Sequence, residues 1–223
     1  YPLRRQRQMC IRDRFNQGVL GHALSDAWAA RLPFVGLLVW TLSSVWYGIY
    51  SFAQNPRLQP VAFAFGGEAK PKDYAQTLAD GGLLAFMACL GLAQLSHETT
   101  PALVQLSLLA WLFCTFALLP LKPKFGLVGV SLGLVALTLS GAPNIALALG
   151  LGCTWALRDQ IPLAVRLRVI SGITVISTLS YLLGFQWNLV SWQLAPPLSL
   201  KQWQDAGSLL FWFTWPAWPL ACL

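Results

Sequence analysis

Long apolar stretches without charge are the feature that most constrains how this chain can fold. The clearest runs from Pro33 to Ala53 and contains no charged side chain. About 20 apolar residues in a helix cross the roughly 30 Å hydrocarbon core of a bilayer. Hydrophobic residues make up 56% of the 223 residues and charged residues only 10%, against about 25% charged in ordinary globular domains. The sequence therefore predicts an integral membrane protein and excludes a secreted disulfide scaffold and a nucleic-acid-binding domain.

Further apolar stretches follow the first, separated by short polar segments. They comprise residues 81–95, 102–120, 125–140, 145–157, 169–187 and 206–223. We therefore expect an all-α, polytopic transmembrane helix bundle with six or seven spans. GAPN (141–144) separates two of the runs, which predicts a helical hairpin. Gly129 and Gly133 form a small-xxx-small pair, which lets neighbouring helices pack closely.

The two ends of the sequence are expected to be altered or cut. Residues 1–14 hold five Arg and one Asp and end in MCIRDR, which resembles a translated transposase adapter. A native polybasic arm at the membrane surface is the alternative interpretation. The last apolar run reaches Leu223 without a polar flank. We expect 1–14 to be non-native and 15–223 to be a transmembrane domain that is incomplete at both ends.

The distribution of basic residues predicts the orientation, because Lys and Arg concentrate in cytoplasmic loops. With seven spans and residues 15–32 outside, two basic residues lie outside, Arg31 and Lys201. Eight lie inside: Arg57, Lys70, Lys72, Lys122, Lys124, Arg158, Arg166 and Arg168. The GAPN turn then lies outside. The segment 54–80 allows a second orientation for Asp80, because its PVAFAF stretch could enter the membrane and return Asp80 to the outer face.

The cysteines and histidines form no familiar catalytic or metal-binding pattern. Cys89, Cys114, Cys153 and Cys222 occur singly in apolar runs, which is typical of small buried hydrophobic residues. His22 and His97 are far apart in sequence and lack a partner for a Ser-His-Asp arrangement. Zinc-ligand spacing and phosphate-binding Gly-rich motifs are also missing. We therefore expect no metal site and no identifiable cofactor in this chain.

Two charged residues stand at the edges of apolar runs. Asp80 precedes GGLLAFMACLGLA and has no basic residue within five positions. A carboxylate drawn into a membrane costs about 3 kcal/mol, so Asp80 is interpreted either as a helix N-cap or as a functional group. Arg31 precedes the first run and either snorkels towards the headgroups or contacts a lipid phosphate. Lys70 lies in a mixed-charge segment, which is typical of a solvated surface.

An ordered set of motifs resembles the bacterial family 39 glycosyltransferases of the GT-C superfamily, which are related to aminoarabinose transferases and protein O-mannosyltransferases. The motifs are AWAARLPF (27–34), LADGGLLAF (78–86), GLVGVSLGLVALTLSGAPN (126–144) and WFTWPAWPL (212–220). The resemblance implies a bacterial inner-membrane, multi-pass enzyme. Its reaction would transfer a sugar from a polyprenyl-phosphate donor to a lipid, glycan or protein acceptor at the outer face.

The resemblance also implies roles for individual residues. Asp80 matches a second acidic position that lines the site, whereas the principal acidic residue would lie upstream of Phe15 and is missing. Basic groups would hold the donor phosphate, and Arg31 and Lys70 are the candidates. Ser140 stands where the turn usually carries a basic residue. A divalent metal in the intact parent is left open, and the partners are the bilayer and the lipid-linked sugar, with no nucleic acid.

The number of predicted membrane crossings conflicts with this resemblance. The resemblance places both Asp80 and the GAPN turn on the outer side, which requires an even number of crossings between them. Three apolar runs lie between them. Either one run is not a full crossing or the motifs are misaligned. The alternative function is a non-enzymatic polytopic protein, either a transporter or flippase subunit or a structural subunit. A carrier predicts polar residues that line a path inside the spans. The polar residues inside the runs are Ser, Thr and Gln, with no charge in mid-span, which weighs against a proton- or ion-coupled carrier.

Overall fold

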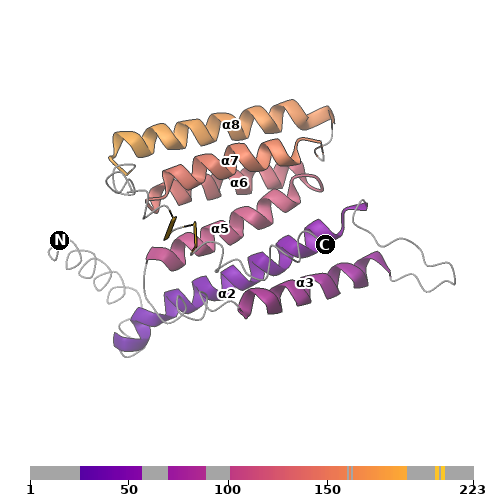
Figure 1. Cartoon of the computed structure of the whole chain (residues 1–223), viewed down its shortest axis with the longest axis horizontal. Coiled ribbons are helices and arrows are strands. Elements are labelled where there is room, and N and C mark those ends of the chain that lie inside the picture. The colour runs from indigo at the N-terminus through magenta and orange to yellow at the C-terminus, as the bar shows by residue number, and fades with distance from the viewer. Residues whose placement is uncertain are drawn as a thin grey trace.

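A computed structural model describes residues 26–56, 70–88, 101–159, 161 and 163–189, together with 204–205 and 207–208. Within these residues the chain forms six α-helices and no strand (Figure 1). The all-α prediction is therefore confirmed for the described part of the chain. The predicted non-native segment 1–14 and nearly all of the apolar run 206–223 lie outside the described residues.

Helices α2 (Asp26–Ala53) and α3 (Pro71–Met87) form an antiparallel pair at one edge of the bundle (Figure 1). Helix α3 begins at Pro71, ten residues before the apolar run 81–95 starts. Proline suits the first position of a helix, where its fixed φ is helical and its missing N–H is not needed. Ala75 and Ala79 are the buried residues of α3, and their small side chains allow α3 to lie close to α2.

Four further helices run back and forth across the bundle (Figure 1): α5 (Pro101–Leu118), α6 (Pro123–Leu139), α7 (Pro143–Leu157) and α8 (Leu163–Gln186). The predicted hairpin between α6 and α7 is confirmed. Gly141 has a φ of +92°, the left-handed conformation that ends many helices. Its N–H donates to Thr138 O at 3.0 Å and the next N–H donates to Leu137 O at 3.2 Å, which caps α6.

The helices pack in a simple order. α3 packs on α2, α2 on α5, α5 on α6, and α6 on both α7 and α8, which also contact each other. Gly129 and Gly133 on α6 face α5, and a Cβ at Gly133 would lie 2.6 Å from Leu112 Cδ2. The close packing predicted from this glycine pair is therefore confirmed. It also lets the Trp111 indole N–H donate to the Gly129 carbonyl at 3.0 Å.

A cluster of buried apolar side chains forms the core between α5, α6, α7 and α8. Its members are Leu112, Phe116, Leu119, Val130, Leu134, Leu137, Ala142, Ala146, Ile161, Val169 and Ile173. Buried hydroxyl groups near this core donate to carbonyls of their own helix. Examples are Thr138 to Leu134 O at 2.9 Å and Ser177 to Ile173 O at 2.7 Å. These bonds satisfy the hydroxyls without a polar partner from another helix.

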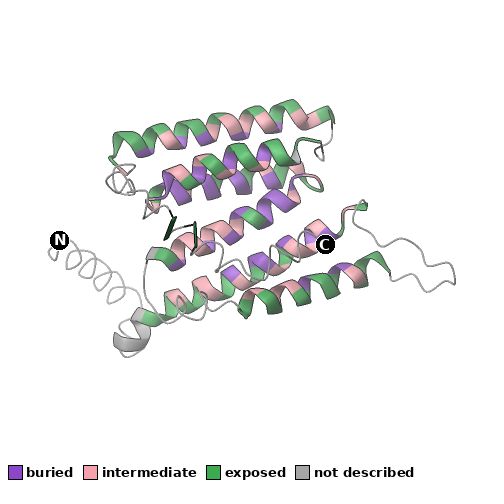
Figure 2. Cartoon of the chain, viewed as in Figure 1, coloured by how far each residue is buried: buried purple, intermediate pink, exposed green. Residues whose placement is uncertain are grey.

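Exposed residues lie along the helices (Figure 2), and many of them have large apolar side chains. Two segments, Arg31–Ala53 and Leu163–Gln186, are long and apolar enough to cross a membrane. Only 22% and 28% of their most apolar windows are buried, whereas the core helix of a water-soluble protein is mostly buried. Within the described residues, α5 and α6 are apolar but shorter. The predicted total of six or seven crossings is therefore not confirmed; in the part of the chain that the structure describes, two helices meet the length and composition that a crossing requires.

Candidate functional site

Asp80 lies inside α3, as the tenth of its 17 residues, and contacts α2. Its carboxylate accepts a hydrogen bond from the indole N–H of Trp46, with 2.7 Å between Nε1 and Oδ1. The interpretation of Asp80 as a helix N-cap is therefore wrong, since Lys70 occupies the N-cap position of α3. Asp80 is exposed, and in the part of the chain that the structure describes it forms no ion pair. An unneutralised carboxylate thus lies along the length of a helix instead of at its start.

Neighbouring aromatic rings hold Trp46 in place. Its ring stacks on Tyr50 with centroids 5.2 Å apart and planes at 11°, and it meets Tyr47 edge-on at 5.0 Å. These contacts fix the direction of the indole N–H, because rotation of the ring would break the stack with Tyr50. Trp46 was not predicted from the sequence as the partner of Asp80. The available signal was a Trp and two Tyr near the end of an apolar run, which sequence reasoning treats as an interfacial belt.

Arg31 and Lys70 do not share a site with Asp80 or with each other. At 1.5 Å per residue, Arg31 lies about 22 Å along α2 from Trp46, and Lys70 about 15 Å along α3 from Asp80. Because α2 and α3 are antiparallel, these offsets point in opposite directions (Figure 1). Arg31 and Lys70 are both exposed, at opposite ends of the helix pair. A single lipid phosphate therefore cannot contact both residues in this arrangement.

Most described basic residues gather at one end of the bundle, where α2, α5 and α7 end and α3, α6 and α8 begin (Figure 1). These residues are Lys70, Lys72, Lys122, Lys124, Arg158, Arg166 and Arg168. We call this end the basic end. Arg31 lies at the opposite end, and Arg57 lies outside the described residues. The alternation of antiparallel helices thus brings together charges that are up to 98 residues apart in the sequence.

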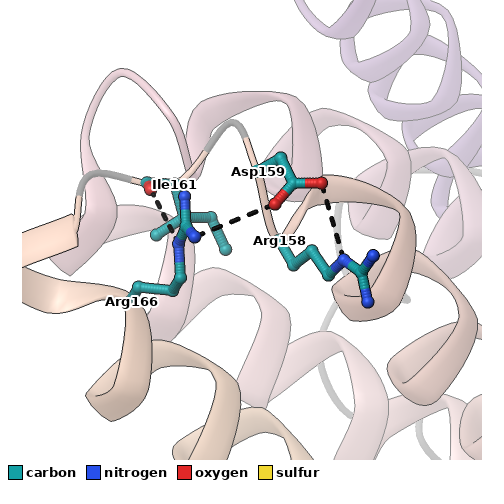
Figure 3. A network of polar contacts seen from close by, with 4 residues as sticks. All are labelled: Arg158, Asp159, Ile161 and Arg166. Carbon is teal, nitrogen blue, oxygen red and sulfur yellow. Dashed lines mark hydrogen bonds and ion pairs between the residues drawn. The ribbon is translucent and has the colours of Figure 1, made fainter.

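The α7–α8 turn carries the ion pairs of the basic end (Figure 3). Asp159 lies between two guanidinium groups, 3.5 Å from Arg158 Nε and 3.8 Å from Arg166 Nη1. Arg166 Nε also donates to the Ile161 carbonyl at 3.4 Å, and Arg158 lies 5.5 Å from the centre of the Trp155 ring. Asp159 and Trp155 were not among the predicted site residues. They lie four residues apart at the end of α7, and this spacing matches no catalytic motif.

A pocket of about 190 Å³ opens at the basic end, next to this turn. Its lining comprises Ser51, Phe52, Asn55, Pro56, Ala117, Pro120, Leu121 and Asp159. Sites for drug-sized ligands measure about 300–1,000 Å³. The pocket is therefore too small to enclose a lipid-linked sugar.

The GAPN turn lies at the end of the bundle opposite to the basic end. The Gln105 side-chain amide donates to the Ser140 carbonyl at 3.1 Å, and the Ser140 hydroxyl donates to the Leu137 carbonyl at 2.7 Å. These bonds stabilise the turn and direct the Ser140 hydroxyl towards its own helix. Asp80, near the middle of α3, is not brought to this turn. Among the described residues, Asp80 and the turn therefore do not form one pocket.

The side chains of the described ranges form neither a candidate metal site nor a cysteine pair. They contain no set of three or more His, Cys, Asp or Glu side chains that could hold a metal ion. Cys114 and Cys153 are free thiols on separate helices. His22, His97, Cys89 and Cys222 lie outside the described residues.

Comparison of the chain with protein-family models, with curated proteins and with solved structures finds no match in any of the three. The likeness to GT-C glycosyltransferases therefore stands on the quoted motifs alone. The proposals that follow are supported by the placement of charged, aromatic and apolar side chains on an all-helical bundle.

Proposed function

We propose that this chain is a membrane-embedded helical bundle from a multi-pass bacterial inner-membrane protein, with its basic end at the cytoplasm. The observation that carries the proposal is the gathering of seven basic residues at one end of a bundle that exposes many large apolar side chains. Lys and Arg are enriched on the cytoplasmic side of membrane proteins. The exposed apolar side chains match lipid acyl chains. Because the bilayer core contains no water that could pair with backbone N–H and C=O groups, it favours helices, whose backbone groups are paired internally.

Alkaline carbonate extraction tests the insertion. The full chain, expressed in bacterial cells, should stay in the membrane pellet, because peripheral proteins are released by this treatment and spanning helices are not. Recovery of folded protein in the soluble fraction would overturn the proposal. A water-soluble fusion partner expressed alone serves as the control for complete lysis.

For the activity of the intact protein, we propose transfer of a sugar from a polyprenyl-phosphate donor to an acceptor, as the motif resemblance implies. Asp80 would then accept the proton of the acceptor. Two features support this role. Its hydrogen bond from Trp46 uses one carboxylate oxygen and fixes the group, and no hydrogen bond to the second oxygen is found in the described part of the chain. A positioned base of this kind contributes about 100-fold or more to a rate.

The test is sugar transfer by the intact parent protein carrying Asp80→Asn, with Asp73→Asn as the matched control. Both residues are exposed on α3 and both substitutions remove one negative charge. Asp80→Asn should lower transfer at least about tenfold at equal membrane expression, whereas Asp73→Asn should leave it unchanged. Unchanged transfer with Asp80→Asn would remove Asp80 from the site.

A specific observation also favours the second candidate, a carrier or flippase subunit. The lack of charge in the apolar runs weighs against a carrier, but Asp80 lies inside α3, which packs along the membrane-length helix α2. Charged residues within membrane helices commonly line ion or substrate pathways. In reconstituted vesicles, a carrier would move a lipid-linked sugar between leaflets without transferring the sugar, and Asp80→Asn would slow that movement. Transfer of the sugar without movement of the lipid-linked sugar between leaflets would favour the enzyme.

A further inference from the structure

Exposed apolar and aromatic side chains surround the arginines of the α7–α8 turn. Trp155 is 70% exposed, and Leu163 and Leu167 on the first turns of α8 are 80% and 82% exposed. Arg158 lies against the Trp155 ring, and Arg166 lies between the two leucines in sequence. Trp and Arg at the end of an apolar helix are typical of the headgroup level of a membrane. The turn thus presents cations and apolar side chains on the same part of the surface.

The charge of this turn is only partly neutralised. One carboxylate, Asp159, faces two guanidinium groups, and both ion-pair distances exceed the usual length of a hydrogen bond. Arg168 is exposed and has no acidic partner among the described residues. The first turn of α8 also holds no acidic residue. Among the described residues, the turn therefore has a net positive charge, and several of its guanidinium N–H groups have no acceptor there.

From these observations we propose that the α7–α8 turn binds the phosphate of an anionic phospholipid. Arg158 and Arg166 donate to the phosphate oxygens, and Trp155, Leu163 and Leu167 contact the glycerol and upper acyl chains. Guanidinium groups suit this role because their planar donors match phosphate oxygens in pairs. The exposed leucines favour a lipid over a soluble anion, because a soluble anion would leave them in water. This inference rests on the membrane placement proposed above and adds a defined lipid site to it.

Asp159 is a positioning residue in this site. The Ile161 carbonyl holds Arg166 from one side, and Asp159 draws both guanidinium groups towards the turn (Figure 3). The same carboxylate competes with the lipid phosphate for their N–H donors. Removing its charge should therefore strengthen lipid binding, which is a gain that misfolding cannot imitate.

The experiment uses the full chain purified in a neutral detergent and transferred to nanodiscs of phosphatidylcholine with increasing phosphatidylglycerol. Native mass spectrometry counts the retained lipids of each class. The unsubstituted protein should retain phosphatidylglycerol in preference to phosphatidylcholine. The double variant Arg158→Gln/Arg166→Gln should lower that preference about tenfold, since each basic residue near an anionic surface contributes several-fold to binding. Asp159→Asn should raise it.

The matched control is Lys122→Gln/Lys124→Gln, which removes the same charge from the same end of the bundle. It should retain most of the preference, because the binding depends on the turn and not on total charge. Equal losses in the lysine and arginine variants would overturn the proposal in favour of diffuse attraction. Equal retention of the two lipids by the unsubstituted protein would also overturn it. So would full competition by soluble glycerol phosphate, which would indicate a free-phosphate site. Carbonate extraction separately reports whether the membrane placement itself fails.

Discussion

The α5–α8 side of the bundle and the α2–α3 pair are held together in different ways. Between α5 and α8, branched apolar side chains such as Leu134 and Ile173 are fully buried and form one continuous cluster. By contrast, α3 buries only Ala75 and Ala79. It meets α2 where Gly82 packs against Ile49 and through the Trp46–Asp80 hydrogen bond. Buried apolar area dominates the stability of the first region, whereas a few specific contacts determine the position of α3. Asp80, the residue with a proposed role in proton transfer, lies in the second region.

The largest effect is expected from a cavity in the α5–α8 core. Leu134→Ala, at a fully buried position of α6, should lower the free energy of unfolding by about 3 kcal/mol. Leu132→Ala on the same helix is the control, because Leu132 is 63% exposed. Unfolding in mixed detergent micelles measures both. Similar losses for the two variants would contradict a core on this face of α6.

A smaller loss should follow from filling the close contact at the start of α6. A Cβ at Gly126 would lie 3.0 Å from the backbone of Leu119, which cannot move aside like a flexible side chain. Gly126→Ala should therefore cost about 1–3 kcal/mol. Gly152→Ala is the control, because nothing lies within 4 Å of the added Cβ. Its expected effect is a stabilisation of about 0.5–1 kcal/mol, since alanine is the better helix former.

In the α2–α3 pair, Trp46→Phe keeps an aromatic ring and removes the N–H that binds Asp80. A hydrogen bond to a charged group contributes about 1.5–3 kcal/mol, and less is expected here because Asp80 is exposed. Hydrogen exchange should rise in α3 and stay unchanged in α6, which would separate the two regions directly. Combining Trp46→Phe with Asp80→Ala should cause no further loss. Faster exchange throughout the bundle would show that α3 is part of the same cooperative core.

The smallest effect on stability is expected at the α7–α8 turn. Asp159 is 67% exposed, and its two ion pairs are long. Exposed ion pairs contribute about 0–1 kcal/mol, so Asp159→Asn should leave the midpoint of unfolding nearly unchanged. A loss comparable to that of Leu134→Ala would assign the turn a structural role and would weaken its interpretation as a lipid site.

Local chemistry made part of this structure predictable from the sequence. The apolar runs predicted helices, GAPN predicted the α6–α7 hairpin, and Gly129 and Gly133 predicted close packing on α5. The start of α3 at Pro71 was not predicted because its first ten residues include three charged side chains, and the continuous apolar run begins only after Asp80. The Trp46–Asp80 contact joins residues 34 positions apart, so it depends on how α2 pairs with α3. The Arg158–Asp159–Arg166 contacts depend in the same way on the geometry of the turn.

Cysteine labelling in intact cells tests the central claim most directly. Lys124→Cys and Gln186→Cys place thiols at exposed positions at opposite ends of the bundle, in a background with the native cysteines replaced by alanine or serine. A membrane-impermeant maleimide should label position 186 and leave position 124 unlabelled until the cells are opened. Labelling of position 124 together with protection of position 186 would contradict the proposed orientation. Equal labelling of both positions in intact cells would contradict a bundle that crosses the membrane.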